Sequence, residues 1–304
     1  MDVDMAAPGL ERIVARDATL DVVAHGISFG EGPVWHSGKG CLFYVDIVGD
    51  TIWKHTPGVG NEVVLRPSNH ADGMTLDPQG RLVVAGWASR TVWRMEDDGA
   101  IVTLASHYQR KKLNTPNDVV VNSDGSIYWT DPSGALFNVG MAGPEDDLQR
   151  YLDFHGVFRL GPDGRTITLV VEDFAYPNGL CFSPDETLLY INDTWLAHIR
   201  VFDVQSDGTL ANGRIFYQLV GSEPGVADGM KVDVEGNVYV TGPAGIHVID
   251  PQGKLLGRIK IPAHTTNMGW GDASWRSLYI TTHSPGMVYR VRLKIPGVPV
   301  EIGR

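Results

Sequence analysis

The chain has 304 residues, of which 43% are hydrophobic and 20% charged, and it carries a formal net charge of −11. This composition is typical of a globular protein that can bury a core, whereas the acidic balance argues against a nucleic-acid partner, because binding phosphates requires a basic surface. No stretch approaches the roughly 20 consecutive apolar residues that a membrane helix needs, so we expect neither nucleic acid nor a membrane as a partner.

The first 26 residues predict an extension followed by one isolated strand. Residues 1–17 show neither the basic nor the apolar segment of a signal peptide. Residues 18–26 (ATLDVVAHG) alternate between apolar and polar side chains, as a half-buried strand does. The two cysteines, Cys41 and Cys181, stand in apolar, strand-like surroundings typical of buried thiols. These features favour a cytoplasmic location.

A short unit then recurs six times along the chain. Each copy opens with a side chain that carries an oxygen, usually followed by glycine, and continues with an apolar strand, a tight turn and a second apolar strand. Turns such as PQG, SDG and VEG supply residues that tolerate a positive φ, and two alternating strands usually follow. The copies open at Glu31, Asp72, Asn117, Asn178, Asp228 and Asn267.

Four strands that recur about every 40 to 60 residues are typical of a β-propeller. We therefore expect an all-β protein, a six-bladed β-propeller with four-stranded blades, as one domain over residues 1–304 with 1–17 as an N-terminal extension. The strand at 18–26 should complete the last blade beside residues 286–294, because ring closure removes an exposed edge. Residues 133–155 interrupt the third unit and should form a loop over one mouth of the propeller.

The six opening residues are expected to line the central channel as a ring of oxygens. Each residue alone is better explained by a turn, because Asp-Gly and Asn-Gly are common turn dipeptides. All six in register favour the ring, since Ser, Pro and Gly occur at none of these positions. Oxygen ligands without His or Cys are the set that a hard divalent cation prefers. A divalent cation in the channel is therefore predicted.

Several strings resemble one known family. EGPVW, PNGL, DGMKVD and LNTPNDVVVNSDGSIYWTDP look like the senescence marker protein / gluconolactonase / luciferin-regenerating-enzyme-like superfamily, and are most similar to its gluconolactonase-type sugar lactonases. The resemblance covers about residues 25–294 and implies a six-bladed propeller with one divalent cation in its channel. It implies calcium as the ion, with magnesium, manganese or zinc as alternatives. The metal ligands that it implies are Glu31, Asn117, Asn178 and Asp228.

The residues around the expected substrate mouth depart from the family pattern. Asp72 stands where such sequences more often have Asn, AGW at 85–87 replaces a Glu-His-Gly stretch, and Lys112 replaces Arg. Each candidate here also has a plainer explanation: a solvated lysine, aromatic packing between blades for Trp87, Trp195 and Trp270, or a histidine bonded within a turn. The residues expected to contact substrate are Asn117, Lys112, Asp72, Trp87, Asn267 and His283.

Together these features predict a metal-dependent lactonase, a carboxylic-ester hydrolase of carbohydrate metabolism that acts on a small-molecule sugar lactone. The cation would polarise the lactone carbonyl, and Asp228 would activate the attacking water. Two alternatives stay open: a phosphotriesterase resembling diisopropylfluorophosphatase, with Asp228 as nucleophile, and a non-catalytic propeller that binds metal or sugar. We expect a monomer or a weak homodimer.

Overall fold

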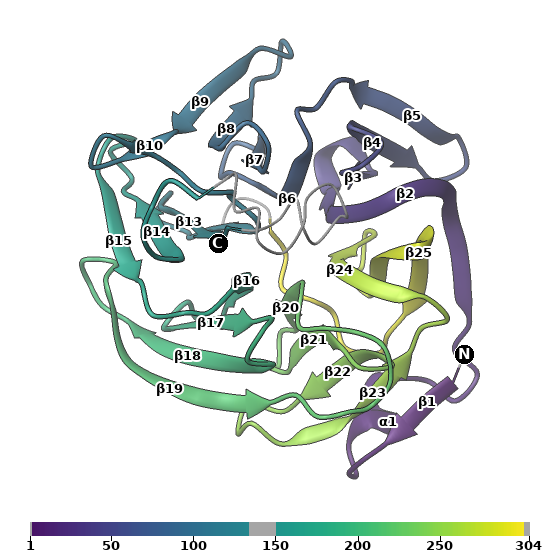
Figure 1. Ribbon diagram of the computed structural model, residues 1–304. Helices are drawn as coiled ribbons and strands as arrows, with labels where there is room; N and C mark the ends of the chain where they lie inside the picture. The colour runs from purple at the N-terminus through teal and green to yellow at the C-terminus, as the bar shows by residue number, and fades with distance from the viewer. Residues whose placement is uncertain (1, 134–149, 301–304) are drawn as a thin grey trace.

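Antiparallel sheets surround a central axis in the computed structural model, which describes residues 2–133 and 150–300 (Figure 1). Three of the sheets have four strands each, and within each sheet the strands follow one another in chain order. The first consists of β6 (Ala71–Leu76), β7 (Leu82–Gly86), β8 (Thr91–Met95) and β9 (Ile101–Ala105). The second consists of β12 (Val119–Val121), β13 (Ile127–Asp131), β14 (Gly156–Leu160) and β15 (Ile167–Val171). The third consists of β16 (Pro177–Phe182), β17 (Leu188–Asp193), β18 (His198–Val204) and β19 (Leu210–Gln218).

A fourth sheet recruits the N-terminus as a fifth strand. The outermost strand of the unit, β23 (Leu255–Lys260), pairs antiparallel with β1 (Asp2–Met5), so the extension expected at 1–17 takes part in the fold. The short helix α1 (Leu10–Ile13) follows, and both its end residues are buried in the core beside this sheet. The strands are β20 (Met230–Val232), β21 (Val238–Gly242), β22 (Gly245–Ile249), β23 (Leu255–Lys260) and β1 (Asp2–Met5).

The fifth sheet has six strands and corrects the expected blade count. Its order is β24-β25-β2-β3-β4-β5, so the first and last sequence units share one hydrogen-bonded sheet. The prediction of six four-stranded blades is therefore wrong, and the propeller has five blades. The strands are β24 (His264–Gly271), β25 (Ser277–Arg292), β2 (Leu20–His36), β3 (Cys41–Asp46), β4 (Thr51–Thr56) and β5 (Gly60–Leu65).

The physical reason for the fusion is the length of β2. Its first half pairs with β25, from Leu20 opposite Val291 to Phe29 opposite His283, and its second half pairs with β3. One 17-residue strand thus leaves one predicted blade and enters the other. The N-terminal strand does pair with the end of the last unit, as expected from the need to cover an open edge.

Smaller elements complete the described residues. A 3-10 turn, η1, spans Ser37–Lys39, and a hairpin is formed by β10 (His107–Tyr108) and β11 (Lys111–Lys112). Cys41 and Cys181 are free and buried. Most of the loop expected at 133–155, namely 134–149, lies outside the described residues. No helix in the described part of the chain is long and apolar enough to cross a membrane.

The turns explain why each unit carries its short polar signature. In the turn between β6 and β7, the Asp77 carboxylate accepts hydrogen bonds from the backbone N–H groups of Gln79 and Arg81. Gly80 of the same turn has φ of 79°, a left-handed conformation that glycine adopts at no steric cost. The side chain of Asp therefore replaces backbone partners within the turn, and Gly allows the chain to reverse.

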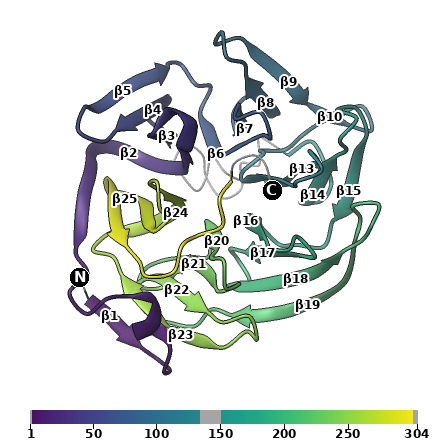
Figure 2. The same ribbon diagram turned by 180° about the vertical axis from the view of Figure 1, so that it is seen from behind.

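Six inner strands line the axis: β2, β6, β12, β16, β20 and β24, in chain order around the channel (Figures 1 and 2). The C-terminal residues, drawn in yellow, cross one end of this channel in Figure 2. They are held there by a bridge between Asp233 and Gly297 and by the backbone N–H of Val298, which donates to the carbonyl of Val232 at 3.2 Å.

Candidate functional site

Close packing of the inner strands explains why glycine follows most of the unit-opening residues. A Cβ atom at Gly32 would lie 2.5 Å from the carbonyl oxygen of Asp72. A Cβ at Gly179 would overlap the carbonyl oxygen of Asp228, and one at Gly229 would overlap the side chain of Asn267. Each inner strand therefore contacts the strand of the next unit, and the opening residues come together at one end of the channel.

Two units lack this glycine: the sixth has Met268 after Asn267, and the third has an aspartate, Asp118, after Asn117. The neighbouring strand accommodates it, because Gly73 of β6 packs directly on Asp118 and on the carbonyl of Asn117. The backbone N–H of Gly73 also donates to that carbonyl at 2.8 Å. Toward the fourth unit, the Thr130 hydroxyl donates to the carbonyl of Asn178 at 2.7 Å. The third unit thus joins the same ring with a charged side chain in place of glycine.

Amide and carboxylate side chains of the ring are paired. The Asn267 amide donates to Glu31 Oε2 at 2.8 Å, and the backbone N–H of Gly32 donates to the same oxygen. The Asn117 amide donates to Asp72 Oδ2 at 3.0 Å. Each pair links residues that open neighbouring units, so the amides fix the orientation of the carboxylates.

The third pair is Asn178 and Asp228. Burial raises the pKa of Asp228, and a hydrogen bond from the Asn178 side chain opposes this rise. The Asn178 amide also donates to Thr194 Oγ1 at 3.0 Å, and the Thr194 hydroxyl donates to the carbonyl of Ala227 at 2.6 Å. The backbone N–H of Asp228 is held by Thr241 Oγ1 at 2.9 Å. Asp228 is partly exposed, whereas Glu31 and Asp72 are buried.

The electrostatics of the ring favour an added positive charge. Burial raises the pKa of Glu31 to about 7, with repulsion from Asp118 acting in the same direction. Burial and repulsion from Glu31 raise the pKa values of both Asp72 and Asp228 well above their usual range. Like charges in a poorly solvated site destabilise the ionised forms, so the ring disfavours full ionisation unless a cation compensates it.

The donor set fits a hard cation in its chemistry. Within residues 2–133 and 150–300, no three His, Cys, Asp or Glu side chains are grouped closely enough to bind one metal ion. Amide oxygens must therefore complete any coordination, and the pairing supplies one, because Asn117 donates through Nδ2 and leaves its Oδ1 for another partner. Carboxylate and amide oxygens without nitrogen or sulfur are the ligands that Ca²⁺ prefers.

Two charged residues beside the ring, Lys231 and Asp118, were not predicted from the sequence. Lys231 Nζ lies 3.8 Å from Asp118 Oδ2 and donates to Asn267 Oδ1 at 3.4 Å. The backbone N–H of Met268 donates to the same Asn267 oxygen, so the amide nitrogen is left to face Glu31. The available signals were a lysine inside an inner strand and an aspartate where four of the other units have glycine.

The remaining predicted substrate residues lie in different surroundings. Lys112 is exposed in β11, and its Nζ lies 5.8 Å from the centre of the Tyr151 ring. Trp87 is only 2% exposed and packs edge-on against His70 in the hydrophobic core, so it presents almost no surface to a ligand.

His283 is half-buried in a stack of rings. Its centroid lies 4.6 Å from that of Phe29 and 4.2 Å from that of His264. Burial, together with repulsion from His264, lowers the pKa of His283 to about 4. An imidazole with this pKa is mostly neutral at pH 7, so it would begin a proton transfer by accepting a proton.

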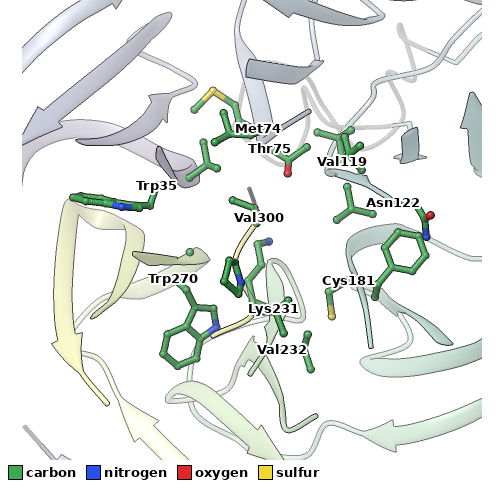
Figure 3. A pocket seen from close by; sticks show the side chains of 18 of the residues that line it. Trp35, Met74, Thr75, Val119, Asn122, Cys181, Lys231, Val232, Trp270 and Val300 are labelled. Atoms are coloured by element: carbon green, nitrogen blue, oxygen red, sulfur yellow. The ribbon is translucent and has the colours of Figure 1, made fainter. Parts of the chain in front are cut away.

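A separate cavity of about 160 Å³ occupies the other end of the channel (Figure 3). Its lining residues follow the ring residues along the inner strands, so the two sites stand one above the other on the same strands. The cavity is mainly apolar, Trp270 forms part of its wall, and Val300 of the C-terminal segment projects into it (Figure 3). Labelled lining residues include Trp35, Met74, Val119, Cys181, Lys231 and Val232.

The model of the SMP-30/Gluconolactonase/LRE-like family matches residues 29–284. The chain belongs to this family. Over 315 aligned positions it is 33% identical to a gluconolactonase from Zymomonas mobilis, covering 96% of this chain and 86% of the relative. A solved gluconolactonase from Xanthomonas campestris superposes with a TM-score of 0.85 at 30% identity, covering 96% of this chain and 95% of that one. The resemblance read from the strings EGPVW, PNGL and DGMKVD is thereby confirmed.

A more distant structure shares the fold alone. It is described as a calcium-binding protein, regucalcin, from Agrobacterium tumefaciens, with a TM-score of 0.78 at 16% identity. The alignment covers 94% of this chain and 98% of that one.

Proposed function

We propose that this member of the family is a carboxylic-ester hydrolase that opens the ring ester of a sugar lactone. The gluconolactonases that align with nearly the whole chain support this activity. The observation that carries the proposal is the ring of three amide–carboxylate pairs at one channel mouth, because it gathers buried acidic groups around one residue, Asp228, that is only partly buried.

The residues that would hold a divalent cation are Glu31, Asn117, Asn178 and Asp228, and calcium is the ion that we propose, with magnesium, manganese and zinc as alternatives. A calcium-binding protein with the same fold and the oxygen-only donor set support this choice. When bound, such an ion supplies Lewis acidity at the lactone carbonyl and favours ionised carboxylates around it.

Asp228 is the proposed general base. Asp228 is the one acid among the six opening residues that is partly exposed as a residue, so we assign the attacking water to it, and Asn178 and Thr241 hold its side chain and backbone. The water oxygen bonds to the carbonyl carbon, the bond from that carbon to the ring oxygen breaks, and Asp228 receives the proton of the attacking water. Asp228 then returns that proton to the ring oxygen, which leaves as an alcohol on the open-chain sugar acid, so the carboxylate is regenerated.

Glu31 and Asp72 have positioning roles in this proposal. Glu31 Oε2 is occupied by the Asn267 amide and the Gly32 N–H, which leaves Oε1 for the cation. Asp72 accepts from Asn117 and so directs the amide oxygen of Asn117. The two aspartates that open similar DGM segments thus have different tasks, since only Asp228 is partly open to solvent.

The test is hydrolysis of glucono-1,5-lactone, corrected for spontaneous opening, before and after chelation and with calcium restored. Chelation should abolish the enzymatic rate and calcium should restore it. Asp228→Asn should lower kcat by at least about 100-fold, whereas Asp72→Asn should keep the cation, measured by elemental analysis, and lose less activity. Full activity after chelation would refute the role of the metal. An Asp228→Asn variant with both metal and rate intact would exclude Asp228 as the base.

The same assay separates the alternatives. An organophosphate substrate included in the panel should be turned over far more slowly than the lactone. A faster organophosphate reaction would identify a phosphotriesterase, and binding without turnover of either compound would identify a non-catalytic propeller. A cytoplasmic location and a monomeric or weakly dimeric state stay predictions.

A further inference from the structure

One tryptophan of this chain, Trp195, is far more exposed to solvent than the others. All eight tryptophans lie within the described residues. Seven are buried or partly buried, whereas Trp195 is 57% exposed, and the adjacent Leu196 is exposed as well. Single exposed apolar residues are common on protein surfaces, but an indole is large and costly to leave in water. The position of Trp195 therefore needs an explanation beyond chance exposure.

The turn that carries Trp195 is rigidly held. It joins β17 to β18, and the buried carboxylate of Asp193 accepts hydrogen bonds from the backbone N–H groups of Trp195 and Leu196, both at 3.0 Å. The same carboxylate accepts from the backbone N–H groups of Ala175 and Tyr176. One buried side chain thus ties the turn to the segment that leads into β16, so the indole is presented from a fixed backbone.

The turn adjoins the ring of carboxylates and amides. Thr194, next to Trp195, accepts a hydrogen bond from the Asn178 amide and donates to the carbonyl of Ala227, the residue before Asp228. Because β17 runs antiparallel to β16, with Asp193 opposite Pro177, this turn lies at the ring end of the channel. The chain neighbour of Trp195 thus contacts the fourth and fifth units of the ring, and the turn of Trp195 lies at the same end of the channel.

Other rings support the indole from one side. The centroid of Trp195 lies 5.1 Å from that of Tyr176, which is buried, and 5.9 Å from that of His155. His155 is itself held by Ser133 at 2.8 Å and by the carbonyl of Ala175. The aromatic support limits the positions available to the indole and leaves its remaining surface open to solvent.

We propose that Trp195 binds the sugar portion of the lactone, by stacking against the apolar C–H face of the sugar ring beside the reacting carbonyl. The inference rests on the proposed function and extends it by naming a residue that determines specificity. A rigid aromatic surface beside polar groups is the usual composition of a site for an amphipathic small molecule. Trp195 selects lactones whose ring carries an extended C–H face, and it contributes to binding without taking part in proton transfer.

The test compares Trp195→Ala and Trp195→Phe with a matched control, Ile215→Ala. Ile215 is also 57% exposed and lies in the same sheet, on its outermost strand β19. With glucono-1,5-lactone, Trp195→Ala should raise KM about three- to tenfold and leave kcat within about twofold, which matches the usual worth of an aromatic contact. Trp195→Phe should recover at least half of the loss, and Ile215→Ala should behave as wild type.

Binding is measured in parallel, so that the inference does not depend on turnover. The probe is gluconolactam, a sugar ring that lacks the reactive ester, titrated by calorimetry into wild type and each variant. Weaker binding of the lactam to Trp195→Ala than to Ile215→Ala supports the role of Trp195, even if no lactone is hydrolysed and the proposed function fails. Equal lactam affinity in the two variants overturns the inference, even if the lactonase activity is confirmed.

One further outcome contradicts the proposal. If Trp195→Ala changes the sedimentation of the protein from dimer to monomer while KM and lactam affinity stay unchanged, the exposed indole is a contact between two copies of the chain. Sedimentation of wild type and both alanine variants at the concentrations of the kinetic assay separates this case.

Discussion

Replacing Asp131 by asparagine should remove a specific part of the pH dependence of stability. Asp131 ends β13 and is 0% exposed. Its Oδ2 accepts from the backbone N–H of Asn114 at 2.8 Å, while Oδ1 has no hydrogen-bond partner among residues 2–133 and 150–300. Burial raises the pKa of this carboxyl to about 8, against about 3.9 for aspartate in an unfolded chain.

The sign of the effect follows from these two values. Between about pH 4 and pH 8 the folded protein keeps a proton on Asp131 that the unfolded chain has released, so a rise in pH favours unfolding. The stabilising contribution is complete below about pH 4 and is lost as the pH rises to about 8. The slope is at most about 1.4 kcal/mol per pH unit. Asp131→Asn removes this slope and carries a constant cost of roughly 1–3 kcal/mol, because its new amide donor has no acceptor there.

Urea unfolding of wild type and Asp131→Asn at pH 5, 6, 7 and 8 measures the difference in unfolding free energy. The wild type should lose stability relative to the variant at each step, whatever other groups titrate in both proteins. Asp163→Asn is the control, because hydrogen bonds from Thr166 lower the pKa of Asp163 to about 2 and its carboxylate stays ionised throughout. A difference between wild type and Asp131→Asn that does not change with pH would refute the argument.

Two further predictions concern the packing and charge of the channel. Gly229→Ala should lower the unfolding free energy by roughly 1–3 kcal/mol, because its Cβ would overlap Asn267. The control Gly38→Ala, in an exposed turn, should change the unfolding free energy by less than about 0.5 kcal/mol. Equal losses for the two variants in urea unfolding would contradict the close approach of Gly229 to Asn267. Lys231→Met should destabilise the protein by roughly 2–4 kcal/mol, because it leaves the buried Asp118 carboxylate without its cation. Adding Asp118→Asn should recover most of that loss, and additive losses in the same unfolding assay would exclude the pairing.

The all-β propeller could be predicted from the sequence because steric requirements repeat in every unit. Glycine at 32, 179 and 229 is required where one inner strand contacts the next, so the polar residue before each glycine could be placed on the channel. The blade count could not be predicted in the same way. Strand β2 (residues 20–36) pairs first with β25 and then with β3, and no turn separates the two halves. The alternation of apolar and polar side chains does not show where the pairing partner changes.

The pairing within the ring also lay beyond sequence reasoning. The spacing of the units placed Asn117 and Asn267 at equivalent positions, but which oxygen each amide nitrogen faces depends on neighbours from other units. Asn267 is oriented by Lys231 and the Met268 N–H, and Asn117 by Asp72. A hydrogen bond between units is a property of the assembled ring, so it becomes visible only when the strands have been placed.

Trp87 and Trp195 show the same limit for the substrate mouth. Each follows the second strand of its unit, Trp87 after β7 and Trp195 after the β17 turn residue Thr194, so the sequence pattern treats them alike. The structure buries Trp87 against His70, whereas Asp193 holds the turn of Trp195 so that the indole stays open. The difference arises from the partners of each turn rather than from the tryptophan itself. We therefore expect a substrate contact where hydrogen bonds fix a turn and leave an aromatic side chain exposed at the channel end that holds the paired carboxylates. Trp195 meets this criterion, whereas Trp87 does not.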